Sequence, residues 1–152
     1  MKLTDALKQK AVIPDLRARN RDDLLEEMVQ ALAPELGQKK ERLVQILKER
    51  EDQCPTAIKD GIAIPHGRVA GLEDIFIGFG RSRAGIKFGA PDGKPTYLFF
   101  LIFAPQNSAG EHLKVLARIA RLCKNSSLRE RLIRAESREK IYEILMEGDA
   151  KL

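Results

Sequence analysis

Hydrophobic residues recur at helical spacing in two segments of the first third of the chain. Between positions 24 and 32 they fall at i, i+1, i+4, i+5 and i+8, which is the pattern of an amphipathic helix. Asn20 can cap this helix, and Pro34 is expected to end it. A second apolar stripe over residues 43–47 predicts another helix, whose charged C-terminal end is Glu49-Arg50-Glu51.

A short apolar run, Ile62-Ala63-Ile64, predicts a buried strand after a loop over residues 52–60. Pro65 keeps the residue before it out of the helical region of backbone space, so we expect the strand to end there. His66 then lies at the tip of the strand. Gly67, which has no Cβ, is expected to let the backbone turn or a ligand approach closely.

Two further strands are predicted in the middle of the chain. Apolar residues alternate from Ile75 to Gly80, and the polar run Arg81-Ser82-Arg83 is expected to end this strand at the surface. A turn signal over residues 91–95 follows. The continuous apolar run from Tyr97 to Phe103 then predicts a central strand that is buried on both faces.

Helices are predicted for the last third of the chain. The first places His112 in its first turn. We expect its buried face to comprise Leu113, Leu116, Ala117, Ala120 and Cys123. Ser127 and Glu130 match a capping box for a short second helix. The inner face of that helix is expected to hold Leu128, Leu132 and Ile133. Ser137 opens a last helix, which Gly148 is expected to stop.

The interleaving of strands and helices places the chain in the α/β class, as a single domain over residues 1–152. A chain of this length buries about two thirds of its unfolded surface without help from metal ions or disulfides. Cys54 and Cys123 lie far apart and outside any CxxC motif, so we expect neither a disulfide nor a zinc site. The N-terminus lacks the apolar core of a signal peptide and no apolar stretch reaches spanning length. We therefore predict a cytoplasmic protein without stable membrane insertion.

The chain carries a formal net charge of +5, and basic residues crowd the segment from Lys114 to Lys140. This segment holds no aromatic residue on which a base could stack, which argues against nucleic acid as a partner. We interpret its basic side chains as solvated helix faces. The alternative is that they dock an acidic protein or membrane headgroups.

His66 and His112 are the only histidines of the chain. A neutral imidazole, with a reference pKa of about 6.5, keeps one nitrogen lone pair free for attack on phosphorus or carbon. The alternative for His66 is a hydrogen bond at a strand end, and for His112 a capping role at a helix start. Because each follows an apolar, strand-like run, the two rings are candidates to meet at one edge of the sheet.

Arg50, Arg68 and Thr56 are candidate phosphate ligands. Guanidinium groups form charge-assisted hydrogen bonds to phosphate oxygens, and a threonine hydroxyl adds a further donor. The alternative is that all three are ordinary surface or turn residues. The chain has no nucleotide-binding glycine loop, no nucleophile elbow and no clustered metal ligands, so we expect neither a cofactor nor a metal. A histidine-based hydrolase lacks a recognisable orienting carboxylate.

Four blocks of sequence resemble the enzyme IIA domains of the bacterial phosphotransferase system. They are Glu49-Arg50-Glu51, the run from Gly61 to Gly67, Phe103-Ala104-Pro105, and Glu111-His112-Leu113. The resemblance is to the fructose, mannitol and nitrogen-regulatory group, and it spans nearly the whole chain. It implies a mixed sheet flanked by helices as the fold.

The resemblance implies that His66 accepts a phosphoryl group from the phosphohistidine of the carrier HPr or of its nitrogen-branch relative. His112 is then the second histidine, which contacts the phosphoryl group, and Arg50 is the arginine that follows the second helix. Transport members pass the group to a cysteine of a IIB protein, whereas nitrogen-regulatory members bind target proteins in one phosphorylation state. We favour regulation because no IIB, IIC or HPr segment is fused, and a homodimer is compatible with the sequence.

The loop before His66 departs from the family pattern. Relatives usually read Gly-Ser-Thr-Gly-Ile-Gly-Asn-Gly, whereas residues 54–61 read Cys-Pro-Thr-Ala-Ile-Lys-Asp-Gly, so only Thr56, Ile58 and Gly61 persist. Loss of the glycines stiffens the loop, and Lys59 and Asp60 are expected to add charges beside the phosphoryl group. This departure motivates a second hypothesis, that the chain is a IIA-like regulatory binding module that is not phosphorylated.

Overall fold

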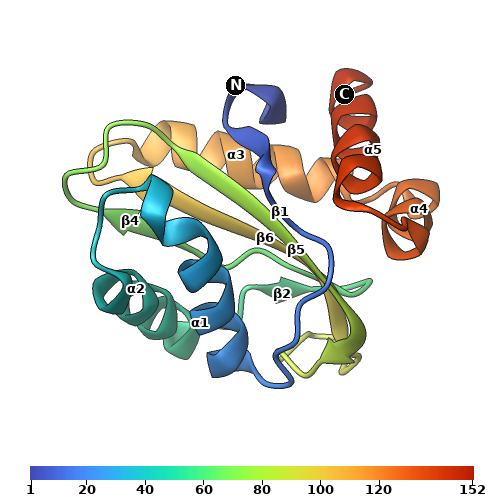
Figure 1. Ribbon diagram of the computed structural model, residues 1–152, viewed down its shortest axis with the longest axis horizontal. Helices are drawn as coiled ribbons and strands as arrows, with labels where there is room; N and C mark the ends of the chain where they lie inside the picture. Colours follow the sequence, from blue (N-terminus) through green and yellow to red (C-terminus); the bar gives the residue numbers. More distant parts are fainter.

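A mixed six-stranded sheet forms the centre of the computed structural model, which describes residues 1–152 (Figure 1). β1 (Leu7–Ile13) lies at one edge and pairs in parallel with β5 (Phe76–Ile86). β5 pairs antiparallel with β6 (Thr96–Pro105), the central strand, in which every residue except Tyr97 is buried. The mixed sheet and the helices that flank it confirm the predicted fold class.

Three short strands complete the sheet on the other side of β6. β3 (Ile62–Ala63) and β4 (His66–Val69) both pair in parallel with β6, and β2 (Ala57–Ile58) pairs antiparallel with β3. His66 therefore begins a strand, opposite Ile102, and the prediction that it ends one was wrong. The proline interrupts the pairing only briefly, because its carbonyl already accepts a hydrogen bond from the Ile102 amide at 3.0 Å.

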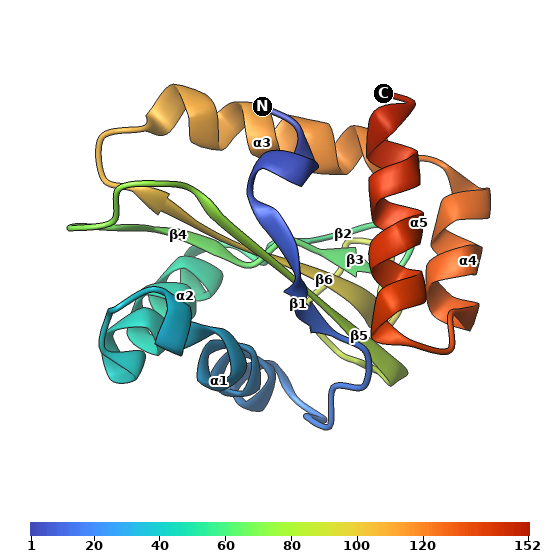
Figure 2. The same ribbon diagram turned by 45° about the horizontal axis from the view of Figure 1, so that its top comes forward.

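Helices cover both faces of the sheet (Figure 2). α1 (Arg21–Leu32) and α2 (Lys40–Gln53) pack side by side on one face, and α3 (Ala109–Leu122) lies on the other. α4 (Ser126–Arg134) packs on α5 (Arg138–Ala150), which in turn packs against β1. Short 3-10 turns occur at Leu3–Asp5 and Ala33–Glu35. None of these helices combines the length and the apolar character that crossing a bilayer requires.

Local capping signals were predicted correctly for two of the helices. The Asn20 side chain accepts a hydrogen bond from the Asp23 amide at 2.8 Å, and the Ser137 hydroxyl caps α5 in the same way. The apolar residues predicted for α1 are all buried. The cap of α4 was misplaced, because the side chain of Asn125 rather than Ser127 accepts the capping bond. Ile133, expected inside α4, is 45% exposed.

The buried stripe of α3 differs from the predicted one by about one residue. Its buried positions are His112, Val115, Ile119 and Leu122. Leu113, expected in the core, is 68% exposed, whereas Cys123 is buried as predicted. Both the predicted and the observed sets of positions hold apolar residues, so the sequence pattern does not decide which set is buried. The packing of the helix against β6 decides it. Gly148 does not stop α5, because the helix continues to Ala150 and the glycine lies close against Leu128.

Two errors concern the edge of the sheet at β1. β1 was not predicted, because residues 8–10 are exposed and polar and its buried residues, Leu7, Ala11 and Val12, do not alternate along the strand. β5 does not end at Arg81, whose side chain is 1% exposed. The Arg81 guanidinium donates hydrogen bonds to the carbonyl oxygens of Pro14 at 3.0 Å and Leu132 at 2.9 Å, and to that of Ala135. These carbonyls accept from Nε and Nη1 of a guanidinium that the sequence alone would place at the surface, and only the buried Nη2 atom has no hydrogen-bond partner.

The basic segment between Lys114 and Lys140 is mostly a set of solvated side chains, as predicted. Three arginines are exceptions, and the first of them, Arg138 at the start of α5, donates to the Val12 carbonyl of β1 at 3.0 Å. Arg118 donates to the buried carboxylate of Asp149 at 2.6 Å, and that carboxylate also accepts from the Leu3 amide at 3.0 Å. Arg129 donates to the Cys123 carbonyl at 2.7 Å. These three residues join α3, α4, α5 and β1 to one another rather than face a partner.

Candidate functional site

The two histidines meet at the edge of the sheet where β4 begins. β4 supplies His66, and the first turn of α3 supplies His112 from the helix above. The centroids of their rings lie 5.0 Å apart, with an angle of 82° between the ring planes. His66 is half-buried and His112 is 6% exposed. The two rings thus converge as the sequence suggested.

The backbone fixes the tautomer of His66. Its Nδ1 lies 2.7 Å from the carbonyl oxygen of Ile64, and a carbonyl oxygen can only accept. Nδ1 therefore carries the proton and Nε2 keeps a free lone pair. Burial lowers the pKa of the His66 ring below its ordinary value, and the positive charge of Arg50 lowers it further. The hydrogen bond to the Ile64 carbonyl raises the pKa but does not outweigh burial. The ring is neutral at pH 7, and Nε2 is its unprotonated nitrogen.

His112 is held in its neutral form more strongly than His66 is. Its pKa is lowered to about 4, first by burial and then by positive charge at His66, Arg68 and Arg50. Its Nε2 atom is buried and has no hydrogen-bond partner. Buried polar atoms are nearly always satisfied, so an unpaired ring nitrogen beside an open nucleophile is a candidate ligand for a group that arrives there.

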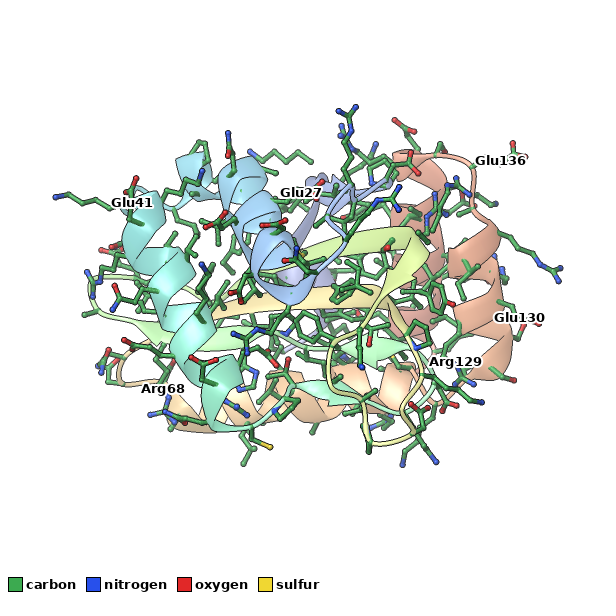
Figure 3. The ribbon with its side chains drawn as sticks, turned by 90° about the horizontal axis from the view of Figure 1, so that it is seen from below. Glu27, Glu41, Arg68, Arg129, Glu130 and Glu136 are labelled. Atoms are coloured by element: carbon green, nitrogen blue, oxygen red, sulfur yellow. The ribbon has the colours of Figure 1, made fainter.

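Two arginines bring positive charge to the histidine pair. Arg68 follows His66 by two residues in β4, so both side chains leave the same face of the strand. Figure 3 labels Arg68, which is exposed. Arg50 stands in the last turn of α2 and donates from Nη1 to the Cys54 carbonyl at 2.7 Å. Both guanidinium groups are near enough to lower the pKa of His112, so both add positive potential where a phosphoryl group would sit.

Thr56 is buried, and its polar groups are used within the chain. Its hydroxyl donates to Glu51 Oε1 at 2.5 Å and its amide donates to Oε2 at 2.7 Å. Glu51 is 3% exposed, and burial raises the pKa of its carboxyl. The two bonds from Thr56 lower this pKa, but burial has the larger effect. Sequence reasoning gave Glu51 no role, although a carboxylate five residues before the loop threonine was a visible signal. The pair ties the end of α2 to the loop that precedes His66.

The unusual loop over residues 54–60 is held by strand pairing in its middle and by a contact with α4 at its end. Cys54 is exposed, whereas Ala57 and Ile58 form β2. Asp60 adopts a φ of 69°, accepts no bond from the histidines, and lies 3.9 Å from Arg129 Nη2 of α4. The expectation that Asp60 adds charge beside the phosphoryl site was therefore wrong, because the turn at Asp60 directs its carboxylate toward α4.

Gly67 acts through packing. A Cβ at this position would overlap the Cγ2 atom of Ile46, so α2 can lie directly on β4 only because the residue is glycine. Of the two expectations for Gly67, a sharp turn or the close approach of a ligand, the turn is absent, since residues 66–69 form a continuous strand paired with β6. The close contact holds Arg50, four residues further along α2, beside the start of β4.

The family model described as phosphoenolpyruvate-dependent sugar phosphotransferase system, EIIA 2, matches residues 5–148. A nitrogen regulatory protein of Bradyrhizobium diazoefficiens is 36% identical over 145 residues, which cover 95% of each chain. The fructose-specific EIIABC component of Bacillus subtilis is 33% identical over 98% of this chain, which spans 24% of that longer protein.

Solved structures agree with these relationships. The crystal structure of the nitrogen regulatory protein IIA-Ntr from Neisseria meningitidis superposes with a TM-score of 0.89 at 34% identity, covering 94% of this chain and 98% of that one. The IIA mannitol structure from Escherichia coli has the same fold, with a TM-score of 0.77 at 23% identity over 91% and 97% of the two chains. The chain therefore belongs to the EIIA 2 family of the phosphoenolpyruvate-dependent sugar phosphotransferase system.

Proposed function

We propose that the chain is a phosphoryl carrier that takes a phosphoryl group from a phosphohistidine donor, HPr or its nitrogen-branch relative, onto Nε2 of His66. The bond between His66 Nδ1 and the Ile64 carbonyl carries this proposal, because it leaves Nε2 as the nucleophile. A new N–P bond forms at Nε2 while the N–P bond of the donor breaks, and the departing imidazole keeps that electron pair. No proton has to move, and positioning supplies most of the catalysis.

We assign each residue around His66 a role in the phosphoryl transfer from its position in the structure. His112, as the tautomer protonated on its unpaired Nε2, donates a hydrogen bond to a phosphoryl oxygen. Arg50 and Arg68 offset the negative charge of the group. Thr56 can contact the phosphoryl group only after its hydroxyl leaves Glu51, so we assign it to holding the loop in place.

We further propose that the carrier is regulatory. The nitrogen regulatory protein of Bradyrhizobium diazoefficiens and IIA-Ntr of Neisseria meningitidis match over 95% and 98% of their own lengths, and phosphorylation adds close to two negative charges to the surface at His66. Leu113 is 68% exposed beside His112, where it offers an apolar contact to a docking protein. A partner that contacts this surface would bind one phosphorylation state better than the other. We place this exchange in the cytoplasm, where the exposed thiol of Cys54 stays reduced.

Reconstituted phosphotransfer tests the proposal. The chain is incubated with enzyme I, HPr and labelled phosphoenolpyruvate, and in parallel with the nitrogen-branch pair. We expect acid-labile label on the wild type and none on His66→Ala. His112→Gln should accept label about 10–1000-fold more slowly, because one hydrogen bond to the developing charge is lost. The variant Arg50→Gln is compared with Arg42→Gln. Arg42 is the matched control because it is an exposed arginine on the same helix, α2, away from the histidines.

The outcomes separate the competing hypotheses. A wild type that takes no label from either donor pair would support the binding module that is not phosphorylated. Label that survives His66→Ala would show that the acceptor is another residue. Nitrogen–phosphorus correlation by NMR of the phosphorylated chain must place the group on Nε2, and a signal from Nδ1 would refute the tautomer argument.

A further inference from the structure

A basic surface lies at the end of the sheet opposite β4. It comprises the connection from β1 to α1, the middle of β5 and the junction of α4 and α5, which lie together in Figure 2. Its exposed basic residues are Arg17, Arg19, Arg83, Arg134 and Lys140. We refer to these five residues and the hollows between them as the distal basic surface.

Arg81 fixes the three segments of this surface to one another. Its Nε atom donates to the Pro14 carbonyl, and its Nη1 atom donates to the carbonyls of Leu132 and Ala135. The Leu16 amide donates to the carbonyl of Arg81 at 2.9 Å. Because the backbone beneath is held this way, the exposed arginines start from fixed positions, which lowers the ordering cost of binding.

Three of the five basic side chains of the distal basic surface have no ion-pair partner, whereas Lys140 lies 3.6 Å from Glu143. Arg17, Arg19 and Arg134 take part in none of the ion pairs. Arg83 shares the single carboxylate of Asp15 with Arg81, at 2.8 Å and 3.9 Å. The surface therefore has an excess of donors for carboxylates.

Two hollows give the distal basic surface a shape. One, of about 230 Å³, lies beside Arg83 and is lined by Ser82, Tyr97 and Ile133, the last of which is 45% exposed. The other, of about 520 Å³, lies between α4 and α5 beside Arg134. The exposed Ile133 side chain beside Arg83, together with the unpaired Arg134 beside the other hollow, fits a polypeptide that carries both apolar and acidic side chains.

We propose that the distal basic surface binds an acidic segment of a partner protein, with carboxylates on Arg17 and Arg134 and an apolar side chain against Ile133. This surface is separate from the phosphoryl site. In the register of the sheet, Arg81 lies opposite Leu98 of β6 and His66 lies opposite Ile102 of β6. The backbone positions of Arg81 and His66 are therefore about 13 Å apart along the strands and about 10 Å apart across them. Because the Debye length is about 8 Å in physiological salt, a phosphoryl group on His66 is largely screened there, and the segment binds in both phosphorylation states.

The test uses the full chain and a fluorescein-labelled peptide of alternating Glu and Leu residues, with anisotropy as the readout. We expect Arg17→Gln/Arg134→Gln to weaken binding about tenfold in low salt, since two charges at the contact are lost. The matched control, Lys39→Gln/Arg42→Gln, removes two exposed charges at the N-terminal end of α2, where Lys39 is the N-cap, and should change affinity less than about twofold. All four side chains are exposed, and thermal unfolding checks that each variant folds.

Three outcomes would overturn the proposal. Equal weakening by the control pair would mean that the peptide responds only to net charge. Greater weakening by Arg50→Gln/Arg68→Gln would place the peptide at the phosphoryl site instead. Tighter binding of a single-stranded oligonucleotide of the same charge, with the same dependence on Arg17 and Arg134, would identify a nucleic-acid surface.

Discussion

Acidification should destabilise the fold through His112, because its ring is buried where a positive charge is unfavourable. In the unfolded chain its pKa has the ordinary value of 6.5, whereas in the fold it is about 4. Between these two values the unfolded chain binds more protons than the folded chain. The free energy of unfolding therefore rises with pH, so the contribution of a neutral His112 is present above pH 6.5 and is lost as the pH falls toward 4.

The size of the effect follows from the separation of the two pKa values. At about 1.36 kcal/mol per pH unit, the whole separation is worth about 3.4 kcal/mol, of which about 2.5 kcal/mol is lost between pH 7.5 and pH 4.5. Other groups also titrate here. The lowered pKa of His66 acts in the same direction, and the raised pKa of Glu51 acts in the opposite one. A comparison with His112→Gln removes their contributions, because both groups remain in that variant.

Urea denaturation at the two pH values measures the effect. Between pH 7.5 and pH 4.5 the wild type should lose about 2.5 kcal/mol more unfolding free energy than His112→Gln, with unchanged dependence on urea. The reasoning is refuted if both proteins lose the same free energy. A wild type that is more stable at pH 4.5, relative to the variant, would show that the fold prefers the protonated ring.

Three further predictions concern packing and reactivity. Gly67→Ala should cost about 1–3 kcal/mol in thermal unfolding, because its Cβ overlaps Ile46; a second change, Ile46→Ala, should recover part of this loss, and no recovery would place the strain elsewhere. Asp149→Asn should cost about 2–4 kcal/mol in urea, since the buried carboxylate holds both the arginine of α3 and the N-terminal backbone; an unchanged midpoint would contradict this. Cys54 should react with a thiol reagent in the folded chain while Cys123, whose pKa burial raises to about 12, reacts only after unfolding; equal rates would argue against the burial.

Sequence reasoning succeeded where the signal was local. Asn20 and Ser137 were identified as caps because a capping bond involves residues within one turn. It failed where the answer depends on distant partners. The burial of Arg81 requires carbonyls from the β1–α1 connection and from the end of α4, which no window of sequence brings together.

The candidate site shows the same division. The meeting of His66 and His112 was foreseen because both follow apolar runs that belong to one sheet. The face of α3 that carries His112 was assigned one position off, since Leu113 and Val115 belong to alternative stripes of similar hydrophobicity. The hydrogen bond from His66 to a backbone carbonyl two residues earlier was not foreseen, because the path of the chain through Pro65 decides it.

The carbonyl of Ile64 has a consequence for how this site can diversify. In the proposed transfer, the main chain rather than a neighbouring side chain selects which nitrogen of His66 takes the phosphoryl group. Substitutions at Arg50, Arg68 or the loop over residues 54–60 are therefore free to alter donor preference or the lifetime of the phosphorylated state, while the regiochemistry stays constant. A protein engineer can retune this exchange site without having to redesign its nucleophile.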